Sequence, residues 1–180
     1  GIAMKVVAPE TFEQLGPDTP GLLLVKGPNI MKGYLDDEAK TAEVMRDGYY
    51  VTGDIATIDD DGFVTITDRL SRFSKIAGEM VPHIKIEEKL HQLAGVIDRT
   101  FAVTAVADAK RWEKIVVLHT YGGSVDELHG RLADSGLPNL WVPEKRSFHK
   151  LETLPLLGSG KLDMTGLKKT ALEKETAAAL

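Results

Sequence analysis

A lysine on a glycine-rich turn is the first residue of this sequence that could do chemistry. Lys161 follows Gly158 and Gly160, which are separated by one serine. Because glycine tolerates positive φ angles, such a turn lets the backbone and a lysine side chain come close to a ligand. A cation held there can stabilise negative charge that develops on a phosphorus centre. The pattern is not a P-loop, which would need a glycine at Pro155 and a serine or threonine at Leu162.

A carboxylate after a predicted strand is the second candidate. Asp54 closes the run Thr52-Gly53-Asp54, which follows the strand-like residues 49–51, so we expect Asp54 at the end of that strand. A carboxylate in this position can accept hydrogen bonds from both hydroxyls of a ribose. The alternative is an aspartate that only caps a turn.

Three motifs occur in order along the chain, at residues 50–54, 68–79 and 156–161. In that order and at about those separations they resemble the last three motifs of the adenylate-forming enzymes, the superfamily of acyl-CoA synthetases, luciferases and nonribosomal adenylation domains. Residues 26–34, 75–81 and 155–161 resemble, more specifically, the acyl-ACP synthetase half of 2-acylglycerophosphoethanolamine acyltransferases. The resemblance covers nearly the whole chain.

The resemblance implies roles for three residues in the first half-reaction. Lys161 would lie between the substrate carboxylate and the α-phosphate of ATP. Asp54 would bind the ribose, and Arg69 would reach the ribose or a phosphate of the same nucleotide. The alternative for Arg69 is an ion pair with Asp68, and the alternative for Lys161 is a solvated lysine in a glycine loop.

The resemblance assigns a second set of residues to the movement and to the thiol step. Ser71 would be the hinge of a mobile domain, although many relatives have Asp or Lys there, so an ordinary linker residue is the alternative. Lys75 and Gly78 would face the active site in the second step, with the glycine leaving room for a phosphopantetheine arm. A cationic strip there would suit an acidic acyl carrier protein. The alternative is a solvated basic face, to which we assign Arg72.

The implied reaction joins a fatty acid to ATP, bound with Mg²⁺, and then transfers the acyl group to the phosphopantetheine of acyl carrier protein or coenzyme A. A separate acyltransferase domain would pass the acyl group to a lysophospholipid on the cytoplasmic side of a membrane. The phosphate loop, adenine segment and acyl pocket of the family have no match here, so we expect a fragment that needs the upstream part of the synthetase and is inactive alone. Two alternatives are another ligase of the superfamily and a non-catalytic carrier-protein-binding module.

Composition is consistent with a globular protein and excludes several classes of site. The chain has 180 residues, a net charge of -5 and no cysteine. It therefore has no disulfide, thiolate metal site or cysteine nucleophile, and its acidic balance does not favour general nucleic-acid binding. The longest apolar runs are far shorter than the roughly 20 residues that span a bilayer.

The apolar pattern predicts an α+β fold in two parts. Residues 1–69 predict a small β-rich subdomain, and residues 70–180 predict a compact α+β domain. The resemblance implies that the first is the barrel-like subdomain that ends the large N-terminal domain of a synthetase, and that the second is its mobile lid with a short antiparallel sheet. The expected strands cover residues 4–7, 21–25, 49–51, 63–67, 101–106 and 115–118. Helices are expected within 36–45, around 86–93, after a capping box at 124–127, and after a cap at Thr165.

Two other constellations do not support a site. His129 and Asp134 have the spacing of an acyltransferase motif, but positions five apart on a helix do not share a face, so the carboxylate could not orient the imidazole. The acidic run at residues 59–61 is consecutive rather than alternate, which indicates a hairpin turn and not a calcium loop. The remaining histidines have no metal-ligand spacing and no evident nucleophile partner, so we predict no metal site.

Overall fold

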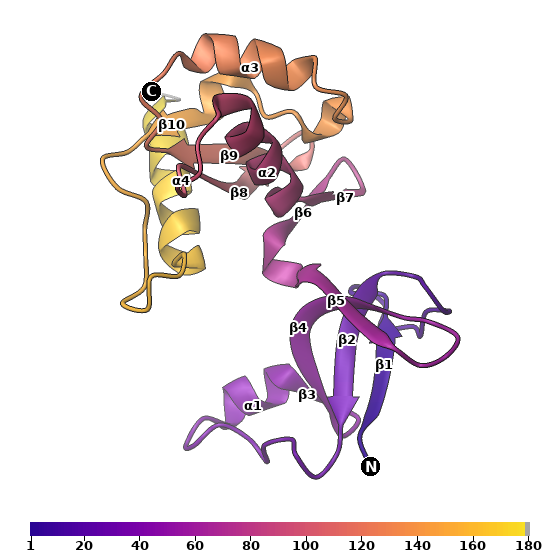
Figure 1. The fold of residues 1–180 in the computed structure, drawn as a ribbon. Coiled ribbons are helices and arrows are strands. Elements are labelled where there is room, and N and C mark those ends of the chain that lie inside the picture. The colour runs from indigo at the N-terminus through magenta and orange to yellow at the C-terminus, as the bar shows by residue number, and fades with distance from the viewer. Residues whose placement is uncertain (179–180) are drawn as a thin grey trace. The chain divides into compact units, whose positions relative to one another are not determined.

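The structure is a computed structural model that describes residues 1–178. The chain forms two compact units, Gly1–Ser71 and Arg72–Leu180, each with its own sheet (Figure 1). The architecture is the predicted α+β class, with a β-rich first unit and an α+β second unit. Among residues 1–178, no helix combines the length and apolar character needed to cross a bilayer.

The first unit is an antiparallel sheet with strand order β1-β2-β4-β3, in which β5 also pairs with β4. Its strands and helix are β1 (Ala3–Val7), β2 (Gly21–Lys26), α1 (Glu38–Val44), β3 (Met45–Arg46), β4 (Tyr49–Ile58) and β5 (Val64–Arg69). Two small apolar clusters cover this sheet, one around Leu23 and Ala56 and the other around Leu22 and Leu24. Alternation of side chains along β2 separates them, because successive residues point to opposite faces.

The long strand β4 corrects our expectation that Asp54 ends a strand. Asp54 lies inside β4 and is paired with Arg69 of β5. The strand continues because it bulges: Val51 pairs with Leu24 and Ile55 pairs with Leu22. Residues 52–54 therefore lie opposite the single residue 23, and Gly53 takes a φ of 77° within the bulge. The glycine of this run permits a bulge, and the strand continues through it.

The second unit has a sheet with strand order β10-β9-β6-β7, in which β8 also pairs with β9. The 3-10 helix η1 (Leu70–Arg72) leads into it from the first unit. The strands and helices are β6 (Phe73–Ile76), β7 (Glu79–Pro82), α2 (His83–Ala94), β8 (Phe101–Asp108), β9 (Trp112–His119), α3 (Val125–Ala133), β10 (Phe148–Lys150) and α4 (Met164–Ala178). Two further 3-10 turns, η2 (Asn139–Trp141) and η3 (Lys145–Ser147), precede β10.

Two apolar layers hold the helices to opposite faces of this sheet. Val103 and Val117 pack with α2 and α3 residues in one cluster, whereas Ala102 and Leu118 pack with Leu167 of α4 in the other. Because side chains alternate along β8 and β9, the same two strands supply both layers. Burial of nearly every residue of β8 and β9 therefore follows from their central place between the helices.

Helix caps follow the sequence signals, with one correction. Ser124 accepts a hydrogen bond from the Glu127 amide at the start of α3, as the capping box predicted. We expected Thr165 to cap α4, but the Asp163 carboxylate accepts hydrogen bonds from the Thr165 and Gly166 amides at 3.1 and 3.0 Å. Aspartate is a stronger N-cap than threonine because its carboxylate also complements the helix dipole.

Candidate functional site

The bulge in β4 presents Asp54 beside Arg69. Arg69 Nε and Asp54 Oδ1 are 2.8 Å apart, and the two residues are register partners on β4 and β5. The Asp54 side chain is 20% exposed and the Arg69 side chain is 67% exposed. The carboxylate is thus held on one side and still reaches solvent, so it can accept further hydrogen bonds from a ligand. Of the predicted site residues, these two lie in direct contact.

Thr52 fixes the shape of the bulge. Its Oγ1 donates to the Leu23 carbonyl at 2.8 Å and accepts from the Asp54 amide at 3.0 Å. One hydroxyl therefore bonds a backbone carbonyl of β2 and a backbone amide of β4 at the bulge. Residues 52–54 therefore form one structural unit. The threonine hydroxyl bonds the backbone, the glycine adopts the positive φ, and the aspartate side chain lies beside Arg69 and reaches solvent.

Tyr50 precedes this bulge on the same strand. Burial raises the pKa of its phenol, and the neighbouring Tyr34 raises that pKa further. The phenol therefore stays protonated at neutral pH and can act as a hydrogen-bond donor next to the carboxylate. The sequence marked Tyr50 as part of a motif but gave it no role.

Lys75 and Gly78 lie on the β6–β7 hairpin, which the sequence did not predict. Lys75 pairs with Met80 and Ile76 pairs with Glu79, so Ala77 and Gly78 form a two-residue turn. Both turn residues have positive φ, 49° and 93°, as a type I′ hairpin requires. Open space surrounds the Cα of Gly78, so the tip of the hairpin is accessible to a ligand.

Trp112 lies next to Lys75 and is strained. The Lys75 Nζ lies 5.7 Å from the centre of the Trp112 indole ring, and the Lys75 amide donates to Glu113 Oε2 at 2.8 Å. Trp112 has a φ of 68° and is 63% exposed. A bulky residue at positive φ is unusual. The sequence gave no signal for it, and Trp112 is the register partner of Ile76, where β9 meets β6.

Lys161 is an exposed residue of a tight loop before α4. The Leu157 amide donates to the Lys161 carbonyl and the Gly160 amide donates to the Leu157 carbonyl, both at 2.8 Å. Gly160 has a φ of 78°, which agrees with the reason glycine was expected there. Arg99 Nη1 also donates to the Gly160 carbonyl at 3.2 Å. The loop backbone is therefore held while the lysine side chain points outward to solvent.

Ser71 is the last residue of the first unit, and Arg72 corrects an expectation. We assigned Arg72 to a solvated basic face, but it is 8% exposed. Its Nη2 is 2.5 Å from Glu87 Oε2 on α2, and its Nη1 lies 3.4 Å from the Met164 sulfur. Arg72 is buried because Glu87 supplies the opposite charge that a buried guanidinium needs. Arg72 is therefore part of the interior of the second unit and not of a solvated basic face.

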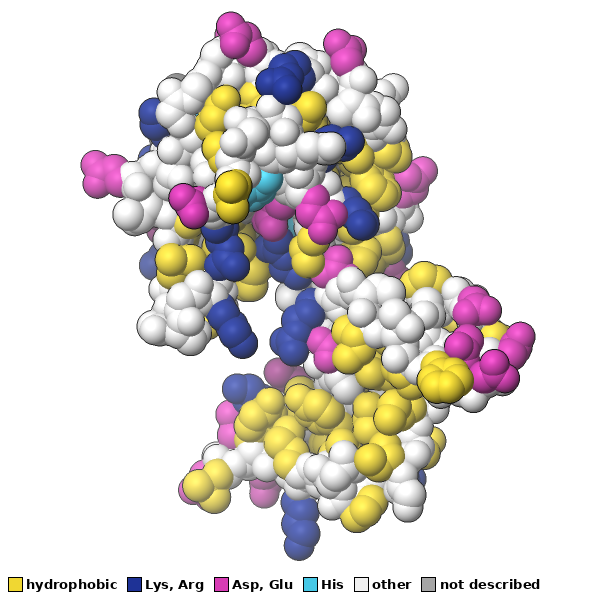
Figure 2. All heavy atoms as spheres, in the orientation of Figure 1, with side chains coloured by type: hydrophobic (Ala, Val, Ile, Leu, Met, Phe, Trp, Pro, Cys, Tyr) yellow, Lys and Arg dark blue, Asp and Glu magenta, His cyan; other side chains and the backbone are white. Residues whose placement is uncertain are grey.

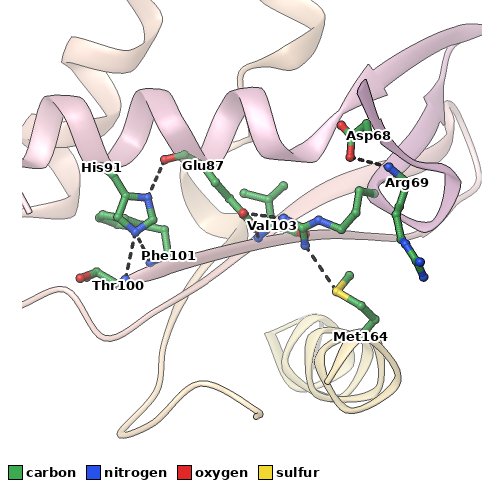
Figure 3. A network of polar contacts seen from close by, with 9 residues as sticks. Asp68, Arg69, Glu87, His91, Thr100, Phe101, Val103 and Met164 are labelled. Atoms are coloured by element: carbon green, nitrogen blue, oxygen red, sulfur yellow. Dashed lines mark hydrogen bonds and ion pairs between the residues drawn. The ribbon is translucent and has the colours of Figure 1, made fainter. Parts of the chain in front are cut away.

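The same network covers the open edge of β8. Glu87 Oε1 accepts from the Val103 amide at 2.6 Å, and His91 Nε2 accepts from the Thr100 amide at 3.0 Å (Figure 3). His91 Nδ1 faces the Glu87 carbonyl at 2.7 Å. Side chains of α2 thus replace the neighbouring strand that an edge strand lacks.

A second buried pair was also missed. Ser74 Oγ and His83 Nε2 are 2.5 Å apart and both residues are buried. Burial, with the positive charge of Arg72 nearby, lowers the pKa of His83 to about 3. We found no nucleophile partner for this histidine in the sequence, because the contact joins the start of α2 to the middle of β6. Its burial makes it a core contact and not an accessible dyad.

Comparison with known proteins places these elements in a larger context. No protein-family model matches the chain. It is 35% identical over 158 residues to a feruloyl-CoA synthase from Amycolatopsis sp, which covers 83% of the chain and 30% of that protein. It is 33% identical over 174 residues to a long-chain-fatty-acid–CoA ligase from Bacillus subtilis (strain 168), which covers 95% of the chain and 30% of that protein. The chain thus spans under a third of these relatives.

Solved structures show the same fold. ATP-bound MatB from Rhodopseudomonas palustris matches with a TM-score of 0.74 and 28% identity, over 94% of this chain and 34% of that one. The o-succinylbenzoate CoA synthetase MenE from Bacillus subtilis, in complex with an acyl-adenylate intermediate, matches with a TM-score of 0.72 and 26% identity, over 93% and 34%. The two sheets and their helices therefore recur together within longer proteins.

Proposed function

We propose that this chain, which corresponds to the C-terminal domain of an enzyme of the adenylate-forming acyl-CoA ligase superfamily, supplies part of a site that activates a carboxylic acid with ATP and passes the acyl group to a thiol. The observation that carries this proposal is the contact between Asp54 and Arg69 at the β4 bulge. An anchored, partly exposed carboxylate suits the two hydroxyls of a ribose, and the adjacent guanidinium suits the ribose or a phosphate.

The two lysines would act at different steps. Adenylation brings an anionic carboxylate to the anionic triphosphate of Mg²⁺-bound ATP, so it needs a positioned cation that touches both. Lys161 on its glycine loop would be that cation. Lys75, on the β6–β7 hairpin, would serve the thiol step, in which a phosphopantetheine sulfur attacks the acyl carbon and AMP leaves. Movement of the second unit about Ser71 would exchange the two lysines.

Coenzyme A is the acceptor that the relatives favour, since they include a feruloyl-CoA synthase and a long-chain-fatty-acid–CoA ligase. Acyl carrier protein is the alternative acceptor. It is supported by the resemblance of the sequences of residues 76–81 and 155–161 to acyl-ACP synthetases. The upstream part of the enzyme would be the remaining partner. Transfer to a lysophospholipid would need a separate domain and is not part of this proposal.

The test uses the full-length ligase that contains this segment. We expect Lys161→Ala to lower pyrophosphate release with ATP and a fatty acid by roughly 10²-fold or more, the usual effect of losing one transition-state donor. Lys75→Ala should retain adenylation and lose thioester formation. Lys169→Ala, an exposed lysine of α4, is the matched control, and parallel assays with coenzyme A and holo acyl carrier protein identify the acceptor. Full adenylation by the Lys161 variant would reject the mechanism.

A further inference from the structure

A cleft lies in the second unit, between the loop that leads into α3 and the segment formed by η3 and β10. It has a volume of about 450 Å³, within the range of small-molecule sites. Its lining residues are His119, Tyr121, Gly123, Val125, Asp126, Lys145, Arg146, Phe148 and Lys150. None of them was singled out as a site residue in the sequence, and none belongs to the site described above.

The lining is cationic. Lys145, Arg146 and Lys150 carry three positive charges, and Asp126 carries one negative charge. Lys145 pairs with Asp126 at 2.8 Å, and Arg146 pairs with Glu144 through Nε at 2.7 Å. These pairs are exposed, so they contribute little and can rearrange around a ligand. Lys150 makes no ion pair within residues 1–178, which leaves one cation of the cleft without a carboxylate.

His119 supplies a buried polar group that lacks a partner. It is 2% exposed, and its Nδ1 makes no hydrogen bond within the described part of the chain. The ring lies between Phe101 and Phe148, with ring centres 6.1 and 6.5 Å away. A buried polar atom without a partner is destabilising, so native structures usually satisfy it. The His119 ring also lines the cleft, so its resonances report on a ligand that binds there.

The remaining wall is aromatic and closely packed. Tyr121 and Phe148 contribute rings to the cleft, and Val125 contributes an apolar side chain. Tyr121 lies so close to Gly123 that an added Cβ would be 2.5 Å from the tyrosine oxygen. The glycine therefore lets the loop fold against the ring. Such a wall favours a flat apolar body next to the anionic group.

We propose that this cleft binds a phosphate monoester with a flat, apolar body. The lining has a net charge of about +2 when its four charged side chains are counted, which matches the charge of about −1.5 to −2 that a phosphate monoester carries at neutral pH. Lys150, Lys145 and the Arg146 fork would hold the phosphate, as cationic side chains commonly do. Tyr121 and Phe148 would contact the body. The proposal does not rest on the proposed ligase function, because the two use different residues.

The test is an NMR titration of the chain with phenyl phosphate, inorganic phosphate and benzoate as probes. We expect saturable shifts of the Gly123 and Val125 amides and of the His119 imidazole, with phenyl phosphate binding more tightly than either other probe. Lys150→Gln should weaken phenyl phosphate binding roughly tenfold, as expected for the loss of a hydrogen bond from a charged donor. Lys169→Gln removes an exposed lysine of α4 and should leave the affinity unchanged.

Three results would overturn the proposal. The first is a lack of saturation in the millimolar range, and the second is an equal effect of the Lys150 and Lys169 variants, which would indicate non-specific attraction. The third is benzoate binding as tightly as phenyl phosphate, which would assign the cleft to carboxylates. A second variant, Tyr121→Leu, distinguishes recognition of the ring from recognition of the phosphate. It should weaken the binding of phenyl phosphate and leave the binding of inorganic phosphate unchanged.

Discussion

Arg72 and Glu87 form a buried ion pair that anchors the first residue of the second unit to α2. Both side chains are at least 86% buried, and the pair also contacts the edge of β8. Removing one partner leaves the other charge buried and uncompensated, which typically costs about 3–5 kcal/mol. We therefore expect Arg72→Met to lower the free energy of unfolding of the second unit by that amount, measured by urea denaturation with far-UV circular dichroism.

A matched control comes from the same helix. Lys85 and Glu88 form an exposed pair at 3.5 Å, so Lys85→Met should change the free energy of unfolding by less than about 1 kcal/mol. Similar effects of the two substitutions would show that Arg72 is not an anchor. A double variant, Arg72→Met with Glu87→Gln, should recover part of the loss, because no buried charge then remains unpaired.

For single residues, the sequence indicated which side chains are candidates for a site, but not which side chains the buried polar residues contact. Lys161 and Asp54 were selected because glycine and the flanking residues leave a local pattern, and their roles stay predictions. Arg72 was misjudged, because its partner Glu87 is distant in sequence and sits on a helix face that only the fold brings to it. Ser74 and His83 were missed for the same reason.

At the scale of elements, the β6–β7 hairpin depends on backbone geometry that only some residues accept. Gly78 has a φ of 93°, where any side chain is strained, whereas Gly130 lies inside α3 with open space around its Cα. We expect Gly78→Ala to destabilise the second unit by about 1 kcal/mol and Gly130→Ala to stabilise it by about 0.5–1 kcal/mol. Urea denaturation of the two variants in parallel measures the opposite signs. A stabilising Gly78→Ala would contradict the assigned turn.

The elements that the sequence predicted well are the long periodic ones. Helix α2 and strands β8 and β9 lie where the apolar spacing placed them, since each packs a continuous face against the core. The hairpin of β6 and β7, and the three-residue strand β10, were not predicted. Strands β6, β7 and β10 have four residues or fewer, so local periodicity carries little information about them. Strand β10 also pairs with β9, which lies far from it along the chain.

The whole molecule comprises two units with separate cores. Apolar clusters of the first unit involve residues up to 70, and those of the second begin at residue 76. The change in sequence texture near residue 70 indicated this division, because short strands give way to helices and buried strands.

Acidic side chains gather at the tip of the β4–β5 hairpin (Figure 2), where Asp59 Oδ1 accepts hydrogen bonds from the Asp61 and Phe63 amides. The acidic run is thus a turn, as its spacing indicated.

Buried histidines make the stability of the second unit depend on pH. In the second unit, burial lowers the pKa of His83 from 6.5 to about 3 and also lowers the pKa of His119. Between pH 6.5 and 3 the unfolded chain therefore binds a proton at His83 that the folded chain does not. Stability is fully present above pH 6.5 and is lost as pH falls, with a slope that approaches about 1.4 kcal/mol per pH unit for one histidine.

The histidine origin of this slope can be isolated by substitution. His83→Gln keeps a side chain that can hydrogen-bond to Ser74 but does not titrate, so its free energy of unfolding should fall less between pH 8 and pH 5 than that of the unchanged protein. The carboxylate of Glu175 contributes below this range. Its burial raises its pKa, but hydrogen bonds from Lys114 and His149 outweigh burial and lower it from 4.5. Urea denaturation at the two pH values, followed by a probe in the second unit, measures the difference. Equal slopes for the two proteins would mean that His83 is not the group that titrates, and that solvent reaches it in the folded state.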